Sequence, residues 1–283
     1  MIGFLSFLFI ILWSSAFITG KIIVEHGSPF ASLSFRFAIV ALGFLSFSFF
    51  YKERILVKPR NILESALSGI LFHGLYLGGC FYAFSIGVPA SITALIVSMQ
   101  PILTNLLAGP ILNEKVTWKQ WLGIILGVCG TVLVLGLDVG KSIPAEGIII
   151  TTIALFAATV GTLWQKNLSG NIPLSVSNFY QAAGASIFLF FIMLFFVNPF
   201  IIFNMKFILS MSWQIVAVSF GAFTILMYLI KVGSASKTSN LFFLIPPVSA
   251  LMAWFFLNEK LFINDLIGLA LCSCGVYIAT IKN

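Results

Sequence analysis

Charged side chains are scarce in this sequence: they make up 8% of it, whereas hydrophobic residues make up 60%. A soluble domain carries about 25% charged residues, because charges cover its water-facing surface. This chain has too few charges to do the same. Its composition excludes an ordinary soluble protein and indicates that a lipid bilayer surrounds most of the chain.

Groups that catalyse reactions or bind metals are also few. The two histidines, His26 and His73, do not form the His-Glu-x-x-His pair of a metal-dependent protease. The four cysteines lie inside apolar stretches without the spacing of a metal site, so we expect them to pack as small hydrophobic side chains. We therefore expect no catalytic residues, no metal and no cofactor.

Long apolar stretches dominate what is present. Crossing the hydrocarbon core takes roughly 20 apolar residues, and ten stretches approach or reach that length. They predict an all-α membrane protein with ten transmembrane helices, at 4–23, 30–51, 63–84, 88–110, 119–137, 144–165, 174–197, 208–230, 238–257 and 263–281.

The net charge of +7 does not indicate a nucleic-acid partner, because the basic residues lie in short connections between apolar stretches. Membrane proteins concentrate Lys and Arg on the cytoplasmic side. With the N-terminus inside, ten of the 15 Lys and Arg lie in inner connections, four in outer ones and Arg36 within a helix. We predict a multi-pass protein of a bacterial inner membrane with both termini in the cytoplasm.

The sequence also repeats itself. Asn113-Glu114-Lys115 returns as Asn258-Glu259-Lys260, at a shift of 145 residues. The same shift relates Gly123 to Gly268, Gly130 to Gly275 and Pro101 to Pro246. We predict two units of five helices each, at 1–140 and 141–283. An odd number of helices gives the units opposite orientations in the membrane, and inverted repeats around a central cavity are a recurring design of transporters.

At these motifs the chain resembles the EamA family of the drug/metabolite transporter superfamily, over nearly its whole length. The motifs are Trp13 through Phe17, Pro29, Arg36-Phe37, Ala90-Ser91 through Pro101 and Trp121 through Gly130 in the first half, and Trp164, Pro173, Ser236 through Pro247 and Gly268 through Gly275 in the second.

The resemblance implies a ten-helix secondary carrier for amino acids, metabolites or amphipathic compounds, often moved outward. It also implies that the first four helices of each half surround a central cavity and that the fifth and tenth pack behind. Small multidrug carriers of the superfamily use an acidic residue buried in the first helix. Here the first acidic residue is Glu25, at the end of that helix, so proton coupling by that mechanism is not carried over.

Polar and aromatic residues inside the helices are the candidates for substrate contact near the midplane, because lipid-facing positions are expected to be aliphatic. Arg36 is the one basic residue well inside an apolar stretch, and we place it on the outer approach to the site. The sequence leaves two roles open for Arg36, a bond to an anionic substrate or a structural role. The predicted contacts are Trp13, Arg36, His73, Tyr76, Thr93, Gln100, Trp164, Asn240 and Phe243.

Three prolines, Pro101, Pro246 and Pro247, fall inside predicted helices. Proline removes a backbone hydrogen bond and kinks a helix, so we predict hinges at these positions. We expect Glu114 and Glu259 to cap short hairpins. Whether Glu64, Glu146 or His73 titrates during transport stays open.

Together these features predict a secondary transporter that moves an amino acid or a related amphipathic metabolite by alternating access, as an exporter or exchanger. A receptor or assembly subunit without transport is the alternative, and an intramembrane enzyme is a weaker one. The expected partners are a small-molecule substrate and the lipid bilayer. The sequence leaves open whether transport is coupled to a proton or to a counter-substrate, and whether the protein is a monomer or a homodimer.

The predicted orientation can be tested by chemical labelling. Single cysteines are placed near residues 56 and 204, in a background without the four native cysteines. A membrane-impermeant thiol reagent added to intact cells should label the residue near 204 and spare the one near 56, because only the connection around residue 204 is predicted to lie outside. Labelling of 56 alone would reverse the orientation.

Overall fold

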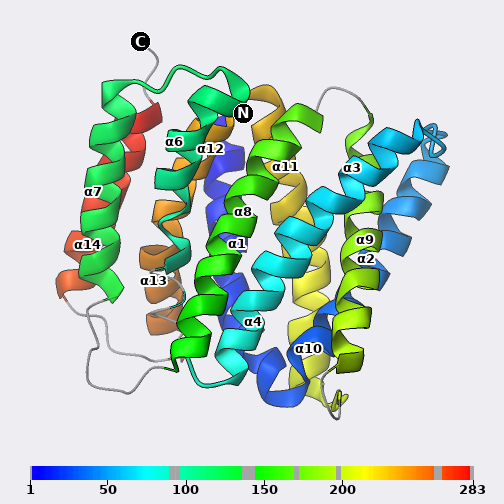
Figure 1. The fold of residues 1–283 in the computed structure, drawn as a ribbon. Helices are drawn as coiled ribbons and strands as arrows, with labels where there is room; N and C mark the ends of the chain where they lie inside the picture. Colours follow the sequence, from blue (N-terminus) through cyan, green and yellow to red (C-terminus); the bar gives the residue numbers. More distant parts are fainter. Residues whose placement is uncertain are drawn as a thin grey trace.

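The fold is a bundle of helices. The structure, a computed structural model, describes residues 2–88, 93, 96–135, 144–168, 172–195, 199–257 and 263–280, which form ten helical runs (Figure 1). Three of the runs continue through a π- or 3-10 segment. In chain order the elements are α1 (Ile2–His26), α2 (Pro29–Phe50), α3 (Pro59–Gly69), the π-helix η1 (Ile70–Leu77), α4 (Gly78–Ser85), α6 (Gln100–Leu112), α7 (Trp118–Leu135), α8 (Ala145–Leu168), α9 (Leu174–Phe195), α10 (Met205–Trp213), the π-helix η2 (Gln214–Phe223), α11 (Thr224–Val232), α12 (Ala235–Ser239), the 3-10 helix η3 (Asn240–Leu244), α13 (Ile245–Leu257) and α14 (Ile263–Thr280).

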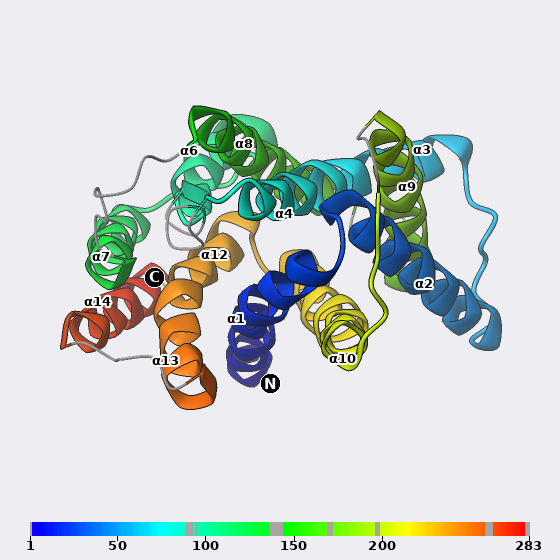
Figure 2. The same ribbon diagram turned by 90° about the horizontal axis from the view of Figure 1, so that it is seen from below.

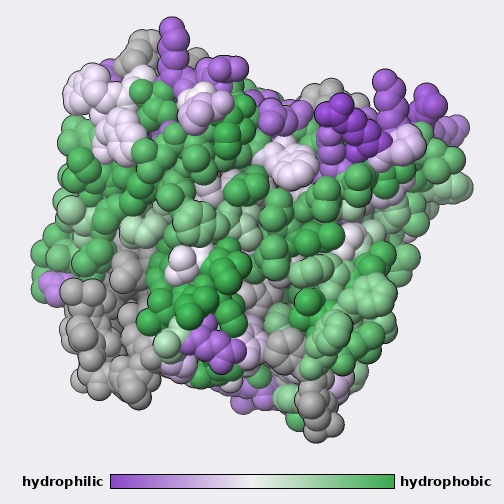
Figure 3. Space-filling model, viewed as in Figure 1, coloured by the Kyte–Doolittle hydropathy of each residue, from purple (hydrophilic) through white to green (hydrophobic). Residues whose placement is uncertain are grey.

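The surface of this bundle suits a bilayer. Six of the runs are long and apolar enough to cross a membrane, among the residues that the structure describes. Large apolar side chains point outward, such as Phe49 and Phe195, which are 76% and 83% exposed. Figure 3 shows hydrophobic residues covering the middle of one face, with hydrophilic residues gathered along its upper edge. Both ends of the chain lie toward that edge (Figure 1).

Two helix pairs stand at opposite ends of the bundle. Seen from below, α7 packs against α14 at one end and α2 against α9 at the other, with the remaining runs between them (Figure 2). The α7–α14 pair corresponds to the fifth and tenth predicted helices. Its place at one end agrees with the packing that the family resemblance implies.

Glycines allow α7 and α14 to approach closely. A Cβ atom on Gly123 would lie 2.4 Å from the carbonyl oxygen of Gly275, and one on Gly130 would lie 2.6 Å from that of Gly268. Neither distance leaves room for a side chain. The contacts are reciprocal, because the 145-residue shift relates Gly123 to Gly268 and Gly130 to Gly275. Small residues at such crossings let apolar helices pack through backbone contacts.

The prolines occupy a different position from the one predicted. α6 begins at Gln100 after a turn at Ser98–Met99, so Pro101 lies in its first turn instead of inside a continuous helix. Pro246 and Pro247 likewise follow the first residue of α13, which comes after the 3-10 segment η3. The first turn tolerates proline because its N–H groups have no intrahelical partner. These prolines therefore start helical segments, and the hinge role predicted for them stays a prediction.

Glu114 also differs from its predicted role, because it caps another helix and not its own hairpin. Its carboxylate accepts hydrogen bonds from the backbone N–H groups of Ala235 (3.0 Å) and Ser236 (3.2 Å), at the start of α12. α6 ends instead at Asn113, which adopts the left-handed conformation with φ 56°. Glu114 thereby ties the two halves together. Its repeat mate Glu259 lies outside the described residues.

The close α7–α14 crossing predicts a strong response to one methyl group. Gly123→Ala should lower the melting temperature, because overpacking a tight contact costs about 1–3 kcal/mol. Gly109→Ala is the matched control, since the nearest atom to its Cβ would be 3.8 Å away. Thermal unfolding of both variants in detergent should separate them. Equal melting temperatures would contradict the backbone contact.

Candidate functional site

A buried cavity lies between helices of both halves. α1, α2, η1, α4 and η2 supply its walls, and the space open to the centres of water-sized molecules is about 40 Å³. One water needs roughly 10–15 Å³ by this measure, so the cavity holds roughly three. An amino-acid-sized solute needs side chains to move first. The two π-helices face each other across it, and their bounds differ by shifts of 144 and 146 residues, close to the repeat.

Arg36 lines this cavity from α2. Its side chain is 3% exposed, its Nε donates to the Ser219 hydroxyl oxygen at 3.0 Å, and its guanidinium lies 5.2 Å from the centre of the Phe37 ring. Among the described residues the one ion pair joins Arg60 and Glu64 near the surface, so no described carboxylate pairs with Arg36. The sequence-based placement of Arg36 on an outer approach is replaced by a position in the cavity wall.

His73 and Gln214 add two further polar groups with unused bonding capacity. The His73 ring lies 4.5 Å from that of Phe37 and 4.3 Å from that of Phe223, and its Nδ1 has no hydrogen-bond partner in the described part of the chain. Gln214 donates from Nε2 to the Ala16 carbonyl and the Thr19 hydroxyl, while its Oε1 has no partner there. Buried polar atoms are normally satisfied. Unpartnered atoms also occur away from the cavity, for example on Asn178 and Gln181, so those of His73 and Gln214 make the cavity a candidate site because they line it together with Arg36.

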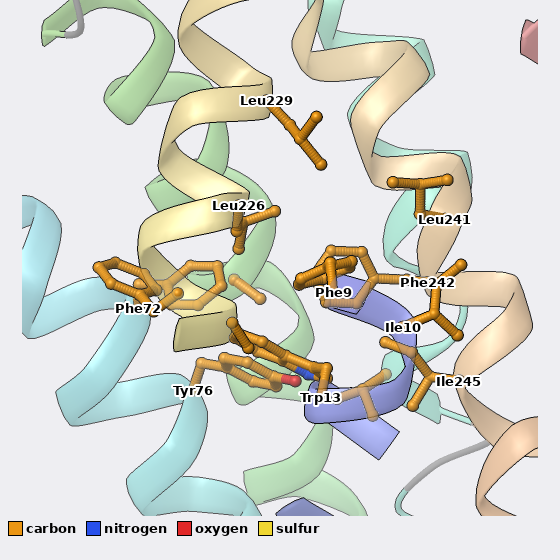
Figure 4. Close-up of a cluster of buried hydrophobic side chains, with 14 of the residues drawn as sticks. Phe9, Ile10, Trp13, Phe72, Tyr76, Leu226, Leu229, Leu241, Phe242 and Ile245 are labelled. Atoms are coloured by element: carbon orange, nitrogen blue, oxygen red, sulfur yellow. The ribbon is translucent and has the colours of Figure 1, made fainter. Parts of the chain in front are cut away.

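Aromatic side chains close the cavity toward the end at which the chain begins. Figure 4 shows Trp13 beside Tyr76, with Phe9 and Phe242 next to them, and the Phe9 and Phe242 rings meet edge to face. The Trp13 ring centre lies 5.6 Å from that of Phe242 and 6.0 Å from that of Phe72. Farther along the same end, Leu226 and Leu229 continue the apolar packing. Trp13 therefore belongs both to the cavity wall and to the apolar cluster beyond it.

The predicted contact residues divide into two groups. Trp13, Arg36, His73 and Tyr76 line this cavity together. The other five lie outside its walls.

Gln100 donates to the Thr162 hydroxyl at 2.9 Å and so joins α6 to α8. Asn240 accepts from Asn105 at 3.2 Å, and Phe243 packs where a Cβ atom on Gly127 would be. Trp164 is half-buried on α8, and Thr93 is buried with no partner for its hydroxyl among the described residues.

Sequence reasoning missed the contribution of η2. Gln214, Ser219 and Phe223 all line the cavity, yet none stands out in a helix rich in small and apolar residues. The repeat held a usable signal, because a shift of about 145 residues carries the stretch around His73 onto the stretch around Val218. An inward polar residue in one half therefore predicts polar residues near the matching place in the other half.

Comparison with known proteins decides the family. The sequence profile of the EamA-like transporter family matches residues 1–136 and 145–281. The chain belongs to the EamA-like transporter family. It is therefore a membrane transporter and not an enzyme, and its partners include a small-molecule substrate.

Relatives and a solved structure agree with this membership. "Uncharacterized transporter YyaM" of Bacillus subtilis is 29% identical, over 96% of this chain and 91% of its own length. A "Probable amino-acid metabolite efflux pump" of Escherichia coli is 23% identical, over 98% of this chain and 93% of its own. A crystal structure with 20% identity superposes with a TM-score of 0.82 over 98% of this chain and 95% of that one. This last likeness supports the fold of the EamA-family chain.

The two groups of polar residues should respond differently to substitution. Gln100→Ala should lower the free energy of unfolding by about 1 kcal/mol, since it removes a buried hydrogen bond. His73→Phe should leave it unchanged or raise it, because it removes an unsatisfied polar atom from an aromatic environment. Denaturant titration followed by circular dichroism measures both. A large loss of stability in His73→Phe would show a structural bond at this histidine.

Proposed function

We propose that this EamA-family protein is a secondary carrier and that the central cavity is its substrate site. One observation carries the proposal: Arg36, His73 and Gln214 bring unused bonding capacity to one buried cavity with aromatic walls. Aromatic surfaces with a few placed polar groups suit a small amphipathic solute. The relative named for amino-acid metabolite efflux supports a substrate derived from amino acids and an outward direction.

We further propose that the halves at 1–140 and 141–283 form an inverted repeat whose movement gives alternating access. The reciprocal glycine contacts of α7 and α14 and the matched π-helices support a two-fold relation between the halves. The small cavity and the aromatic cluster beside it correspond to a closed state, which must open to admit or release a solute. The turn at Ser98–Met99 before Pro101 and the 3-10 segment η3 before α13 are the places where α6 and α13 can tilt.

Filling the cavity should stop transport. Cys80 is buried in the cavity wall, whereas Cys129 on α7 is exposed toward lipid. In proteoliposomes, efflux of a panel of labelled amino acids and their acylated and deaminated derivatives should identify at least one substrate. Cys80→Phe should then abolish its flux, because a ring occupies the site, and Cys129→Phe should transport normally.

Ala16→Leu fills the same cavity from α1 and guards against a folding defect in Cys80→Phe. Size-exclusion profiles and melting temperatures identify folded protein. Wild-type flux through either folded, filled variant would remove the cavity from the pathway. Saturable binding without time-dependent flux in the wild type would instead support a receptor.

A further inference from the structure

The cavity carries a formal charge that the described protein does not neutralise. Arg36 is the one Lys, Arg, Asp or Glu among the residues that line it. His73 lies between the rings of Phe37 and Phe223, which are surroundings that disfavour a second positive charge beside Arg36. The residues that line the cavity therefore place one positive charge in an apolar bundle, where an uncompensated charge is costly.

The guanidinium has donors to spare. Arginine has five N–H donors, and in the described structure only Nε has a protein acceptor, the Ser219 hydroxyl. The terminal nitrogens form no hydrogen bond with a described residue. A planar guanidinium matches a carboxylate in a two-bond arrangement, and such charged pairs are stronger than neutral hydrogen bonds. A solute carboxylate at these nitrogens would satisfy both the donors and the charge.

Charge balance then distinguishes between classes of carboxylate. A monoanion brings the occupied site to zero net charge, whereas a zwitterionic amino acid leaves it at one positive charge and an amine raises it to two. No described residue that lines the cavity has a carboxylate to receive an ammonium group. The unpartnered Gln214 Oε1 is a neutral acceptor and suits a donor such as an amide N–H or a hydroxyl, whereas His73 Nδ1 donates or accepts according to the tautomer of the ring.

Building on the carrier function above, we propose that the substrate is an organic monoanion without a free ammonium group. Its carboxylate binds Arg36, its apolar body lies against Trp13, Tyr76 and Phe223, and a neutral N–H or O–H meets Gln214. N-acylated amino acids fit all three features. Deaminated or other aryl and alkyl carboxylates fit the first two.

Probes with one body and different charges test this proposal. N-acetylphenylalanine, 3-phenylpropionate, phenylalanine and 2-phenylethylamine are titrated into the purified full-length chain in lipid nanodiscs, and the corresponding leucine series covers a different body. Binding is read by calorimetry and by the shift in melting temperature. In whichever of the phenylalanine and leucine series binds more tightly, the anions should bind at least about tenfold tighter than the amino acid. The amine of that series should show no saturable binding.

Arg36→Gln should remove the preference for anions. Arg36→Lys should retain a weaker preference, because lysine keeps the charge but lacks the planar guanidinium that forms two hydrogen bonds with one carboxylate. Arg54→Gln is the matched control, since it removes the same charge from an exposed arginine whose Nε donates to the Leu56 carbonyl. This control should bind like the wild type.

The outcomes separate the two proposals. If an amino acid binds as tightly as its anionic partners, or if Arg36→Gln keeps the anion preference, the monoanion proposal is wrong while the carrier function stands. If proteoliposomes show flux of some other solute but neither probe series binds, the monoanion proposal is also wrong. If no tested solute moves and none binds folded protein, the carrier function fails with it.

Discussion

Hydrocarbon offers no hydrogen bonds, and this constraint organises the molecule. Backbone N–H and C=O groups in a bilayer must bond within the protein, so regular helix is required wherever lipid touches the chain. The three described departures from α-helix each pack against neighbouring helices. η1 and η2 line the central cavity, and η3 packs against α7 and α14. π-segments inside helices often mark functional sites, and here two of them line the same candidate site.

The same constraint divides the interior polar side chains into two kinds. Gln120 donates to both Asn105 and Ser236, and Asn105 donates to Asn240, so this chain of bonds joins α7, α6 and the α12–η3 run. These bonds hold helices together, although Asn240 Nδ2 has no partner among the described residues. Around the cavity, Arg36, His73 and Gln214 keep capacity that no described residue uses. The unused capacity around the cavity is distinguished by the charge of Arg36 and by the open space beside it, since unpartnered buried atoms such as the Thr93 hydroxyl also occur outside its walls.

A span must supply an apolar stretch as long as the membrane is thick, so hydropathy predicts where spans lie. Six described runs are long and apolar enough to confirm this. The predicted helix at 174–197 and α9 at Leu174–Phe195 differ by two residues. Membership of the cavity was harder to predict. Trp13, Arg36, His73 and Tyr76 were found because charge or ring size is unusual mid-span. Gln100 and Asn240 look equally polar in sequence, and only their three-dimensional partners place them in helix contacts.

Trp13 connects the site to the closure of the bundle. Its ring forms part of the cavity wall, and it also packs against Phe9, Phe72 and Phe242 in the apolar cluster toward the end at which the chain begins. Phe72 comes from η1 and Phe242 from η3, so this contact joins segments of both halves. A solute that lies against Trp13 therefore touches the side chain on which that closure depends. Packed interiors shift between discrete arrangements instead of deforming continuously, so a solute at the proposed site would be in contact with a cluster that joins both halves.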